Sequence, residues 1–420
     1  YDYQGKYYGQ VSFRRDGSSV FGSNNRWGNF WSVGGKWRVS EEEFLKDNAI
    51  FTNLALRASY GTVGNQDIDW YAARGFYSAG YNYDSTPGIV PVSLNLPDLG
   101  WETSKKLNIG IDLTLARRWN LTIDLYNEAT SNMLFELPIS QVTGLSKVYQ
   151  NIGSMRNRGV EIGLNGTILQ TKGWTWTAFA NVTLNQNRVT KLSGGKPIEG
   201  TYTIQQEGYP LRQFYMVEYA GVDPNTGNPL WYKNETGDET TTNWNECAKR
   251  YLGSADPKAY GGFGTRVQWK NFDFSADFNY RLGGKVYALS NRSYLSAGSK
   301  GNITPTTYLY EHAWTENNRY TDVPKYIYGN TSGENNHSSR FLYSGNFLRV
   351  KNLQLGYTLP KQLLKKALID NMRIYVSVDN IYTFKAKDFV GYDPETYTSG
   401  LISFQYPSTR KFLAGITLGF

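Results

Sequence analysis

Residues 107–127 read LNIGIDLTLARRWNLTIDLYN. In the first half, every second residue is apolar, and polar or small residues stand between them; after Arg117 and Arg118 the same alternation returns. A period of two residues is the pattern of a β-strand with one apolar face, because successive side chains of a strand point to opposite sides. The stretch therefore predicts two antiparallel strands joined by a tight turn.

The alternation recurs along the whole chain, for example in FDFSADFNYR at 272–281, MRIYVSVDN at 372–380 and FLAGITLGF at 412–420. We expect about fourteen antiparallel strands. Their approximate ranges are 4–15, 27–39, 52–61, 101–116, 119–132, 149–170, 174–190, 211–222, 228–234, 258–270, 272–284, 345–359, 371–384 and 409–420. Residues 62–100 give the weakest pattern and are expected to hold short strands at most.

The connections between these strands fall into two kinds. Short ones are expected at 117–118, 171–173, 223–227 and 271, with single helical turns at 40–51 and 360–370. Long ones are expected at 62–100, 133–148, 191–210, 235–257, 285–344 and 385–408, and a modest one at 16–26. Short turns that alternate with long loops are typical of an outer-membrane β-barrel, whereas such long loops are uncommon in compact soluble domains.

Composition limits the other classes of protein. The chain has 420 residues with 33 Tyr and 43 Gly, which suits turn-rich β structure. No apolar run is long enough for a transmembrane helix. The net charge of +8 is scattered among acidic residues, so nucleic-acid binding is not expected. One cysteine and two histidines leave no basis for a disulfide, a metal centre or a catalytic triad, and we expect no enzyme activity and no cofactor.

Tryptophans lie beside the short turns, at Trp119, Trp174, Trp176 and Trp269. An aromatic belt at the edge of a bilayer would have this position. The alternative is a soluble β-sandwich or propeller with tryptophan in its core. Charged residues in the middle of several strands favour the membrane barrel, because its lumen face is polar.

Two groups of residues are candidates for binding. One is an aromatic cluster on a long loop, formed by Trp70, Tyr71, Phe76, Tyr77, Tyr81 and Tyr83. Flat aromatic rings stack on sugars and anchor protein interfaces, although they also pack loops together. The other is Asp393 and Glu395 in GYDPE, which could contact a cation, a substrate or a covering partner.

Two further motifs have simpler interpretations. Residues 223–229, DPNTGNP, offer oxygen ligands to Ca²⁺, but each residue type also suits a turn, and we interpret the motif as a turn. GGFG at 261–264 lacks the lysine and the helix that a phosphate-binding loop requires.

Several long blocks resemble the SusC/RagA-like TonB-dependent transporters of Bacteroidetes outer membranes. These blocks are RRDGSSVFGSNNRWGNFWSVGGKWRVSEEEFL, LRASYGTVGNQDI, GWETSKKLNIGIDL, NIGSMRNRGVEIGL, YLGSADPKAYGGFGTRVQWKNFDFS, SSRFLYSGNFLRVKNLQLGYTLPK, VSVDNIYTFKAKDFVGYDPE and YPSTRKFLAGITLGF. They occur in the family's order and cover nearly the whole chain. Arg158 stands where the family more often has lysine.

The resemblance implies an all-β, antiparallel transmembrane barrel of 22 strands in the outer membrane of a Gram-negative bacterium, embedded in lipid bilayer and lipopolysaccharide. It implies active import of large nutrients, oligosaccharides or peptides, with energy from the TonB complex. A SusD-like lipoprotein would cover the extracellular loops, and the pair often dimerises. The C-terminal Phe420 resembles the signal that the barrel-assembly machinery recognises.

We expect residues 1–420 to be a single domain, the C-terminal portion of such a barrel. The family's signal peptide, TonB box, plug domain and first barrel strands have no counterpart in this sequence, and we expect the first and last strands not to pair with each other. A passive outer-membrane porin or adhesin and a soluble carbohydrate-binding β protein remain the alternative functions.

Overall fold

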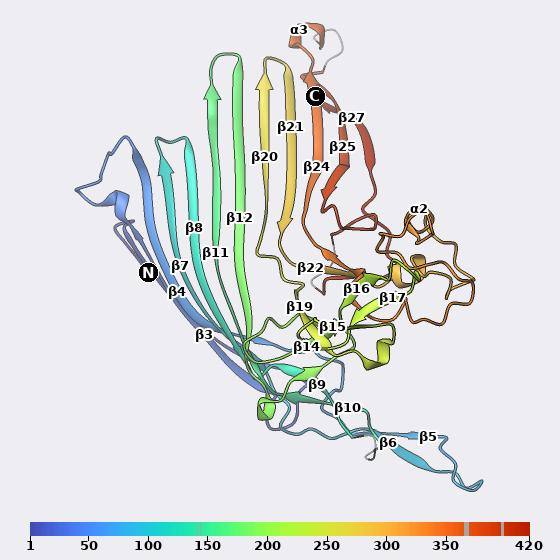
Figure 1. Ribbon diagram of the computed structural model, residues 1–420. Coiled ribbons are helices and arrows are strands. Elements are labelled where there is room, and N and C mark those ends of the chain that lie inside the picture. The colour runs from blue at the N-terminus through green and yellow to red at the C-terminus, as the bar shows by residue number, and fades with distance from the viewer. Residues whose placement is uncertain (141, 143, 365–368, 396–398) are drawn as a thin grey trace. The chain divides into compact units, whose positions relative to one another are not determined.

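Long antiparallel strands dominate the chain (Figure 1). The structure is a computed structural model that describes residues 1–140, 142, 144–364, 369–395 and 399–420. The chain forms two compact units, which are described separately. The first comprises Tyr1–Gly166, Thr183–Ile198 and Gln206–Leu211, and the second Thr167–Val182, Glu199–Gln205 and Arg212–Phe420.

The first unit is built on strands in the order β1-β2-β3-β4-β7-β8-β11-β12, all neighbours in sequence apart from the loop strands between them. Their bounds are β1 (Asp2–Tyr3), β2 (Tyr7–Gly17), β3 (Trp27–Arg38), β4 (Phe51–Asn65), β7 (Glu102–Leu115), β8 (Trp119–Ser131), β11 (Ser154–Gln170) and β12 (Trp174–Lys191). Strands β11 and β12 each contribute residues to both units.

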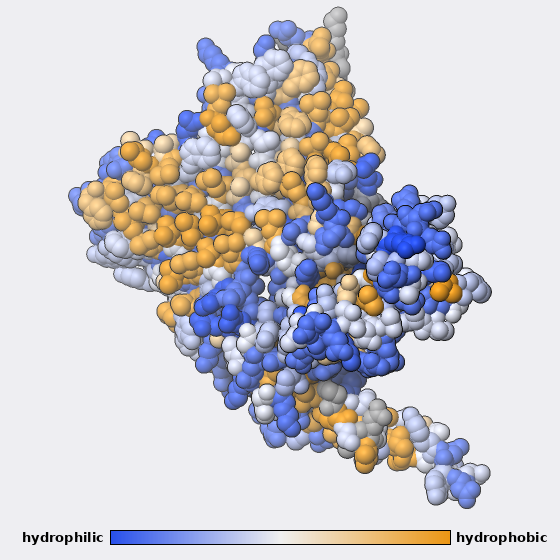
Figure 2. Space-filling view, viewed as in Figure 1, coloured by the Kyte–Doolittle hydropathy of each residue, from blue (hydrophilic) through white to orange (hydrophobic). Residues whose placement is uncertain are grey.

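The register of these strands lines up their apolar side chains on one face. Ile111 of β7 pairs with Ile123 of β8, which in turn pairs with Ile162 of β11. Ile109 and Leu125 form the next such pair, and both side chains are about half exposed. Figure 2 shows hydrophobic side chains gathered over the strands, with hydrophilic ones over the loops. An apolar strand face that stays exposed is the reverse of the soluble pattern.

The opposite face of the same strands carries paired charges. Arg57 of β4 donates through Nε to both carboxylate oxygens of Asp112, at 3.0 and 3.1 Å, and through Nη2 to Asp124 at 2.7 Å. Gly110 makes this reach possible, because a Cβ at that position would lie 2.6 Å from Cζ of Arg57. The alternation that predicted strands thus separates an apolar face from an ion-paired one.

The loops of the first unit carry short elements of their own. They are the 3₁₀ turns η1 (Val39–Glu41) and η3 (Ser193–Gly195), the hairpin β5 (Phe76–Ala79) and β6 (Ile89–Ser93), and the pair β9 (Leu134–Pro138) and β10 (Lys147–Asn151). A small core of Phe21, Ala73 and Leu99 packs against Leu134 of β9 and Tyr149 of β10. The Tyr149 hydroxyl donates to Asp69 at 2.9 Å and ties two loops together.

The second unit continues the strand pattern with the order β12-β20-β21-β24-β25-β27. Its strands are β20 (Ala259–Trp269), β21 (Phe272–Leu282), β24 (Phe347–Thr358), β25 (Asn371–Lys385) and β27 (Lys411–Gly419). Charges again pair on one face: Arg373 donates to Asp273 at 2.5 and 2.9 Å beside Gly356. Trp174 and Trp269 stack at the short turns with ring centroids 5.4 Å apart.

The long loops of the second unit have a core of their own. Its fully buried members include Phe214, Tyr287 and Phe341. The loop strands are β13 (Ile198–Glu199), β14 (Thr203–Gln205), β15 (Gln213–Val217), β16 (Tyr219–Val222), β17 (Pro229–Tyr232), β18 (Thr240–Thr241), β19 (Lys249–Ser254), β22 (Lys285–Ala288), β23 (Leu342–Ser344) and β26 (Leu401–Ile402). The helices are α1 (Asn291–Tyr294), α2 (Thr307–His312) and α3 (Lys361–Leu364), with 3₁₀ turns η4 (Trp244–Glu246) and η5 (Ser339–Phe341).

None of the helices within the described residues is long and apolar enough to cross a membrane.

The structure corrects part of the predicted topology. The ranges 211–222 and 228–234 do form strands, but β15, β16 and β17 belong to small sheets in the loops rather than to the long sheet. The turn at 223–227 therefore joins two loop strands and is not one of the short turns of the wall. The predicted strand at 149–170 is two strands, β10 and β11, in different sheets.

Other predictions are confirmed. The antiparallel all-β architecture is present, and residues 62–100 hold the short strands β5 and β6. A 3₁₀ turn occurs at the start of the predicted turn at 40–51, and helix α3 lies within 360–370. Residues 365–368 of that range lie outside the described residues.

Candidate functional site

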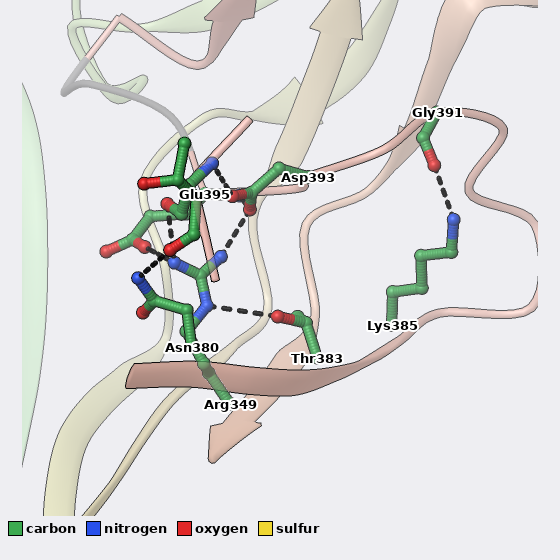
Figure 3. A network of polar contacts seen from close by, with 9 residues as sticks. Arg349, Asn380, Thr383, Lys385, Gly391, Asp393 and Glu395 are labelled. Carbon is green, nitrogen blue, oxygen red and sulfur yellow. Dashed lines mark hydrogen bonds and ion pairs between the residues drawn. The ribbon is translucent and has the colours of Figure 1, made fainter. Parts of the chain in front are cut away.

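The most strongly organised polar site in the second unit centres on Arg349 of β24. Its side chain is 1% exposed. The guanidinium donates to Asp393, to Glu395 Oε2 at 2.5 Å, to Ser408 Oγ at 2.8 Å and to Thr383 Oγ1 at 3.0 Å (Figure 3). Because Asp393, Glu395 and Ser408 all follow β25, one buried arginine holds these three residues of the loop after β25 against the strands.

The two acidic candidates of the sequence therefore meet at one cation. Burial raises the pKa of Asp393, but backbone N–H donors of Glu395 and Ser408, together with Arg349, outweigh burial and hold this pKa below its usual value. Glu395 keeps 43% of its side chain exposed. Their first role is to anchor the loop, and contact with a substrate or partner stays a prediction.

A cavity of about 1440 Å³ lies beside this anchor, entirely within the second unit. The loop at 386–410, helix α1 and the start of α2 contribute to its wall. Lining side chains include Tyr294, Tyr308, Lys387, Tyr392, Phe404 and Gln405. The cavity exceeds the roughly 300–1,000 Å³ that small-ligand pockets usually span, so it has room for a large ligand.

Tyrosine hydroxyls at the cavity stay protonated at physiological pH. Burial, then the nearby carboxylate of Asp322, raises the pKa of Tyr308 to about 12. Burial likewise raises the pKa of Tyr343 to about 12. These groups can donate and accept hydrogen bonds but cannot act as bases, so the cavity is equipped for binding rather than for proton abstraction.

The aromatic candidates lie together in the first unit, on and around the β5–β6 hairpin. Tyr71 and Phe76 contact edge to face with ring centroids 6.1 Å apart, and Arg74 stacks over Tyr71. The six rings are all exposed, and Trp70 and Tyr83 exceed 85%. Tyr71 and Phe76 thus pack against each other within the loop, while the exposed surface of the other rings is available to a partner.

The remaining motifs have structural explanations. Asp223 accepts hydrogen bonds from the Asn225 N–H and the Thr226 hydroxyl, so the DPNTG stretch is a turn, as predicted. Phe420 follows the last strand with its side chain exposed. Among the described residues, no group of three or more His, Cys, Asp or Glu side chains is arranged to hold a metal ion.

Sequence reasoning missed Arg349 and Lys387. Arg349 occupies one of the alternating positions of NFLRVKN, where a charged residue normally indicates the solvent-exposed face of a strand. The only signal was its place between the apolar residues Leu348 and Val350, with GYDPE more than forty residues later. Nothing in the sequence pairs the two segments, because β24 and the loop after β25 come together only through the sheet.

Comparison with known proteins agrees with this architecture. Residues 1–291 match the family described as "TonB dependent receptor-like, beta-barrel". TonB-dependent receptor P3 of Formosa agariphila is 32% identical over 460 residues, and TonB-dependent receptor SusC of Bacteroides thetaiotaomicron is 31% identical over 447 residues. Both alignments cover 100% of this chain, but only 44% and 43% of those proteins.

Among solved structures, the RagAB peptide transporter is similar with a TM-score of 0.86 and 33% sequence identity, covering 99% of this chain and 46% of that one. The same assembly in an "open-open" state gives a TM-score of 0.86. The chain thus spans less than half the length of the curated relatives it matches.

Proposed function

This chain belongs to the TonB-dependent receptor family, and from that premise we propose that the whole protein imports large nutrients, oligosaccharides or peptides, across the outer membrane of a Gram-negative bacterium. Among the similar proteins, RagAB is described as a peptide transporter, whereas the name of the SusC receptor states no cargo. The cargo class therefore needs its own argument.

The observation that carries the proposal is the two-faced wall. One face of β7, β8 and β11 is apolar yet exposed, and the other face holds the charges of Arg57, Asp112 and Asp124 in ion pairs. Lipid against the first face would suit its apolar side chains, and water against the second would solvate its charges. A soluble two-layer protein would instead bury the apolar face.

Energy coupling would come from the rest of the protein. A 22-strand barrel with strands about 4.8 Å apart and tilted about 40° is roughly 44 Å wide, and so wide a lumen needs a plug. In the family, the TonB complex pulls on the plug, and we propose the same division of labour here. Residues 1–420 would supply wall and loops, and the remaining sequence the plug and the other strands.

We propose a SusD-like lipoprotein as the lid over the loops, with the transporter–lid pair forming a dimer. The aromatic cluster from Trp70 to Tyr83 is the best candidate for contact with the lid or substrate, because its rings are exposed. Asp393 and Glu395 are weaker candidates, since Arg349 already engages both carboxylates.

Uptake that depends on energy tests this function. Cells that produce the full-length protein and its lid would be given fluorescent oligosaccharides and peptides, with and without a protonophore. We expect uptake to stop when the proton gradient collapses or when the TonB gene is deleted. Uptake that continues in both conditions would identify a passive porin, and a protein that is released without detergent would identify a soluble one.

Assembly offers a second test, which concerns Phe420. Deleting Phe420 should lower the amount of folded protein in the outer membrane, because the barrel-assembly machinery would lose its signal. Uptake per folded molecule should stay the same. Normal membrane levels would remove the proposed role of this residue.

A further inference from the structure

The cavity in the second unit has a chemical bias that goes beyond general import. Its acidic side chains already have donors within the protein. Asp393 and Glu395 accept from Arg349, and Asp388 accepts from the Ser344 N–H at 3.0 Å. Asp322 accepts from the Tyr308 hydroxyl at 3.4 Å. A ligand therefore meets carboxylates whose charge is partly satisfied.

The lysines that line the cavity have fewer hydrogen-bond partners within the protein. Lys385 donates to the carbonyl oxygen of Gly391, which occupies one of the three N–H donors of an ammonium group (Figure 3). Lys387 has no hydrogen bond or ion pair to any residue that the structure describes, and it is exposed at the cavity wall. The free donors of the cavity thus include two cationic groups two residues apart, which favours a ligand that presents anionic oxygens.

Aromatic rings also line the cavity. Phe404 contacts Tyr294 edge to face with ring centroids 5.6 Å apart, and more than half of the Phe404 side chain is exposed. Tyr392 and Tyr406 are almost fully exposed. Next to them, the Gln405 amide offers both a donor and an acceptor. Open ring faces beside neutral polar groups suit sugar rings with hydroxyls at their edges.

We propose that this cavity binds an oligosaccharide that carries carboxylate groups, with the acidic groups held by Lys387 and Lys385 and sugar rings against Phe404 and its neighbouring tyrosines. This inference rests on the proposed import function and names its cargo class. An acidic peptide would also offer carboxylates, but it lacks the ring faces that the exposed aromatic wall would cover.

Binding to the full-length transporter–lid complex in detergent tests the inference. Three probes of matched length would be titrated by calorimetry: an oligogalacturonate, a neutral maltooligosaccharide and an oligoglutamate peptide. We expect the oligogalacturonate to bind more tightly than either of the others. Lys387→Gln should weaken its binding about tenfold, which corresponds to about 1.4 kcal/mol, because the substitution removes a charge-assisted hydrogen bond.

Two variants complete the design. Phe404→Ala should weaken both sugars, because it removes the ring that they share. Lys361→Gln in helix α3, which does not line the cavity, is the matched control and should change nothing. Heat-modifiable gel migration would verify that each variant is folded.

Equal affinity for neutral and acidic sugars, or binding of the peptide in preference to both, would overturn the inference. So would a Lys387→Gln variant that is folded and binds oligogalacturonate like the parent protein. Energy-dependent uptake of another cargo would leave the import function standing while the inference fails. Tight oligogalacturonate binding without energy-dependent uptake would support the inference about the cavity and contradict the proposed import function.

Discussion

The long strands and the loop region of the second unit differ in where their apolar side chains lie: exposed on the strand wall, buried in the loops. In the wall, Ile374 and Val376 of β25 are exposed, whereas Phe214 and Phe341 in the loops are fully buried. Loops surrounded by water gain stability by hiding apolar surface. A wall surrounded by lipid gains nothing by hiding it, and must instead satisfy its backbone and its charges. In one chain, the loops are thus stabilised by burial of apolar side chains, and the wall by pairing of its backbone groups and charges.

Two arginines make the same contrast. Arg373 pairs with Asp273 on the polar wall face, where both side chains keep a quarter or more of their surface exposed. Arg349 at the base of the loops is buried with Asp393. Water can replace the lost partner of Arg373, whereas the Asp393 side chain is only 12% exposed and water reaches it far less. The second pair should therefore be more sensitive to substitution.

The largest effect is therefore expected for Arg349→Met. Removing one partner of a buried ion pair costs about 3–5 kcal/mol, because the remaining carboxylate is left uncompensated. Hydrogen exchange should show the loss at the N–H groups of Glu395 and Ser408, which donate to Asp393. Arg373→Met is the matched control and should affect exchange less. Equal effects would mean that the two arginines occupy similar environments.

A charge on the apolar wall face should have the next largest effect. Ile111→Arg should cost about 2–4 kcal/mol if the residue lies near the bilayer midplane, measured by unfolding in lipid vesicles. Asn108→Arg on the polar face of the same strand is the control and should cost far less. Asp112→Arg would be a poorer control, because the cationic side chains of Arg57 and Lys36 lie beside Asp112. Similar losses at 108 and 111 would favour a soluble core.

The smallest effect is expected for the stability of the loops of the second unit as the pH is lowered. Burial, then the charges of Arg292 and Lys249, lowers the pKa of His337 to about 4. Its ring nitrogens contact the Tyr287 hydroxyl at 3.0 Å and Arg292 Nη1 at 2.8 Å. Above pH 6.5 the imidazole is neutral in folded and unfolded chains alike, and no stability is lost.

As the pH falls from about 6.5 to 4, the unfolded chain binds the proton first, so the loops should become less stable over this window and the loss should end below it. His337 is only partly buried, which will keep the effect modest. Hydrogen exchange near residues 329–341 at pH 7 and pH 5 measures it. His337→Gln should remove the pH dependence, and an unchanged slope in that variant would assign the effect to other groups.

The period-two pattern made most of the wall predictable, since it reflects which side of a strand each residue faces. It could not tell to which sheet a strand belongs. Residues 211–222 and 228–234 alternate well enough to be strands, but apolar side chains in them are buried among the loops. Phe214 belongs to the loop core, and Trp231 is fully buried. Local alternation reports half-burial on any surface, whether the neighbour is lipid or a loop core.

The site was predictable only in part, because its contacts join distant segments. Asp393 and Glu395 stood out as acids on a long loop, whereas their partner Arg349 looked like any polar strand residue. The roles of Gly110 and Gly356 could not be predicted from the sequence either, although each leaves room for an arginine side chain to cross its strand. Such roles depend on register between strands, and single-sequence patterns do not report register.

The central claim, that the wall has one lipid face and one water face, can be tested with single cysteines at 107, 108, 109, 111 and 112 after Cys247→Ser removes the native thiol. Position 110 is omitted because a side chain there would collide with Arg57. A fluorescent label on each cysteine would be quenched by nitroxides attached to lipid tails or dissolved in water. We predict lipid quenching at 107, 109 and 111 and aqueous quenching at 108 and 112. Equal quenching at odd and even positions would contradict the account.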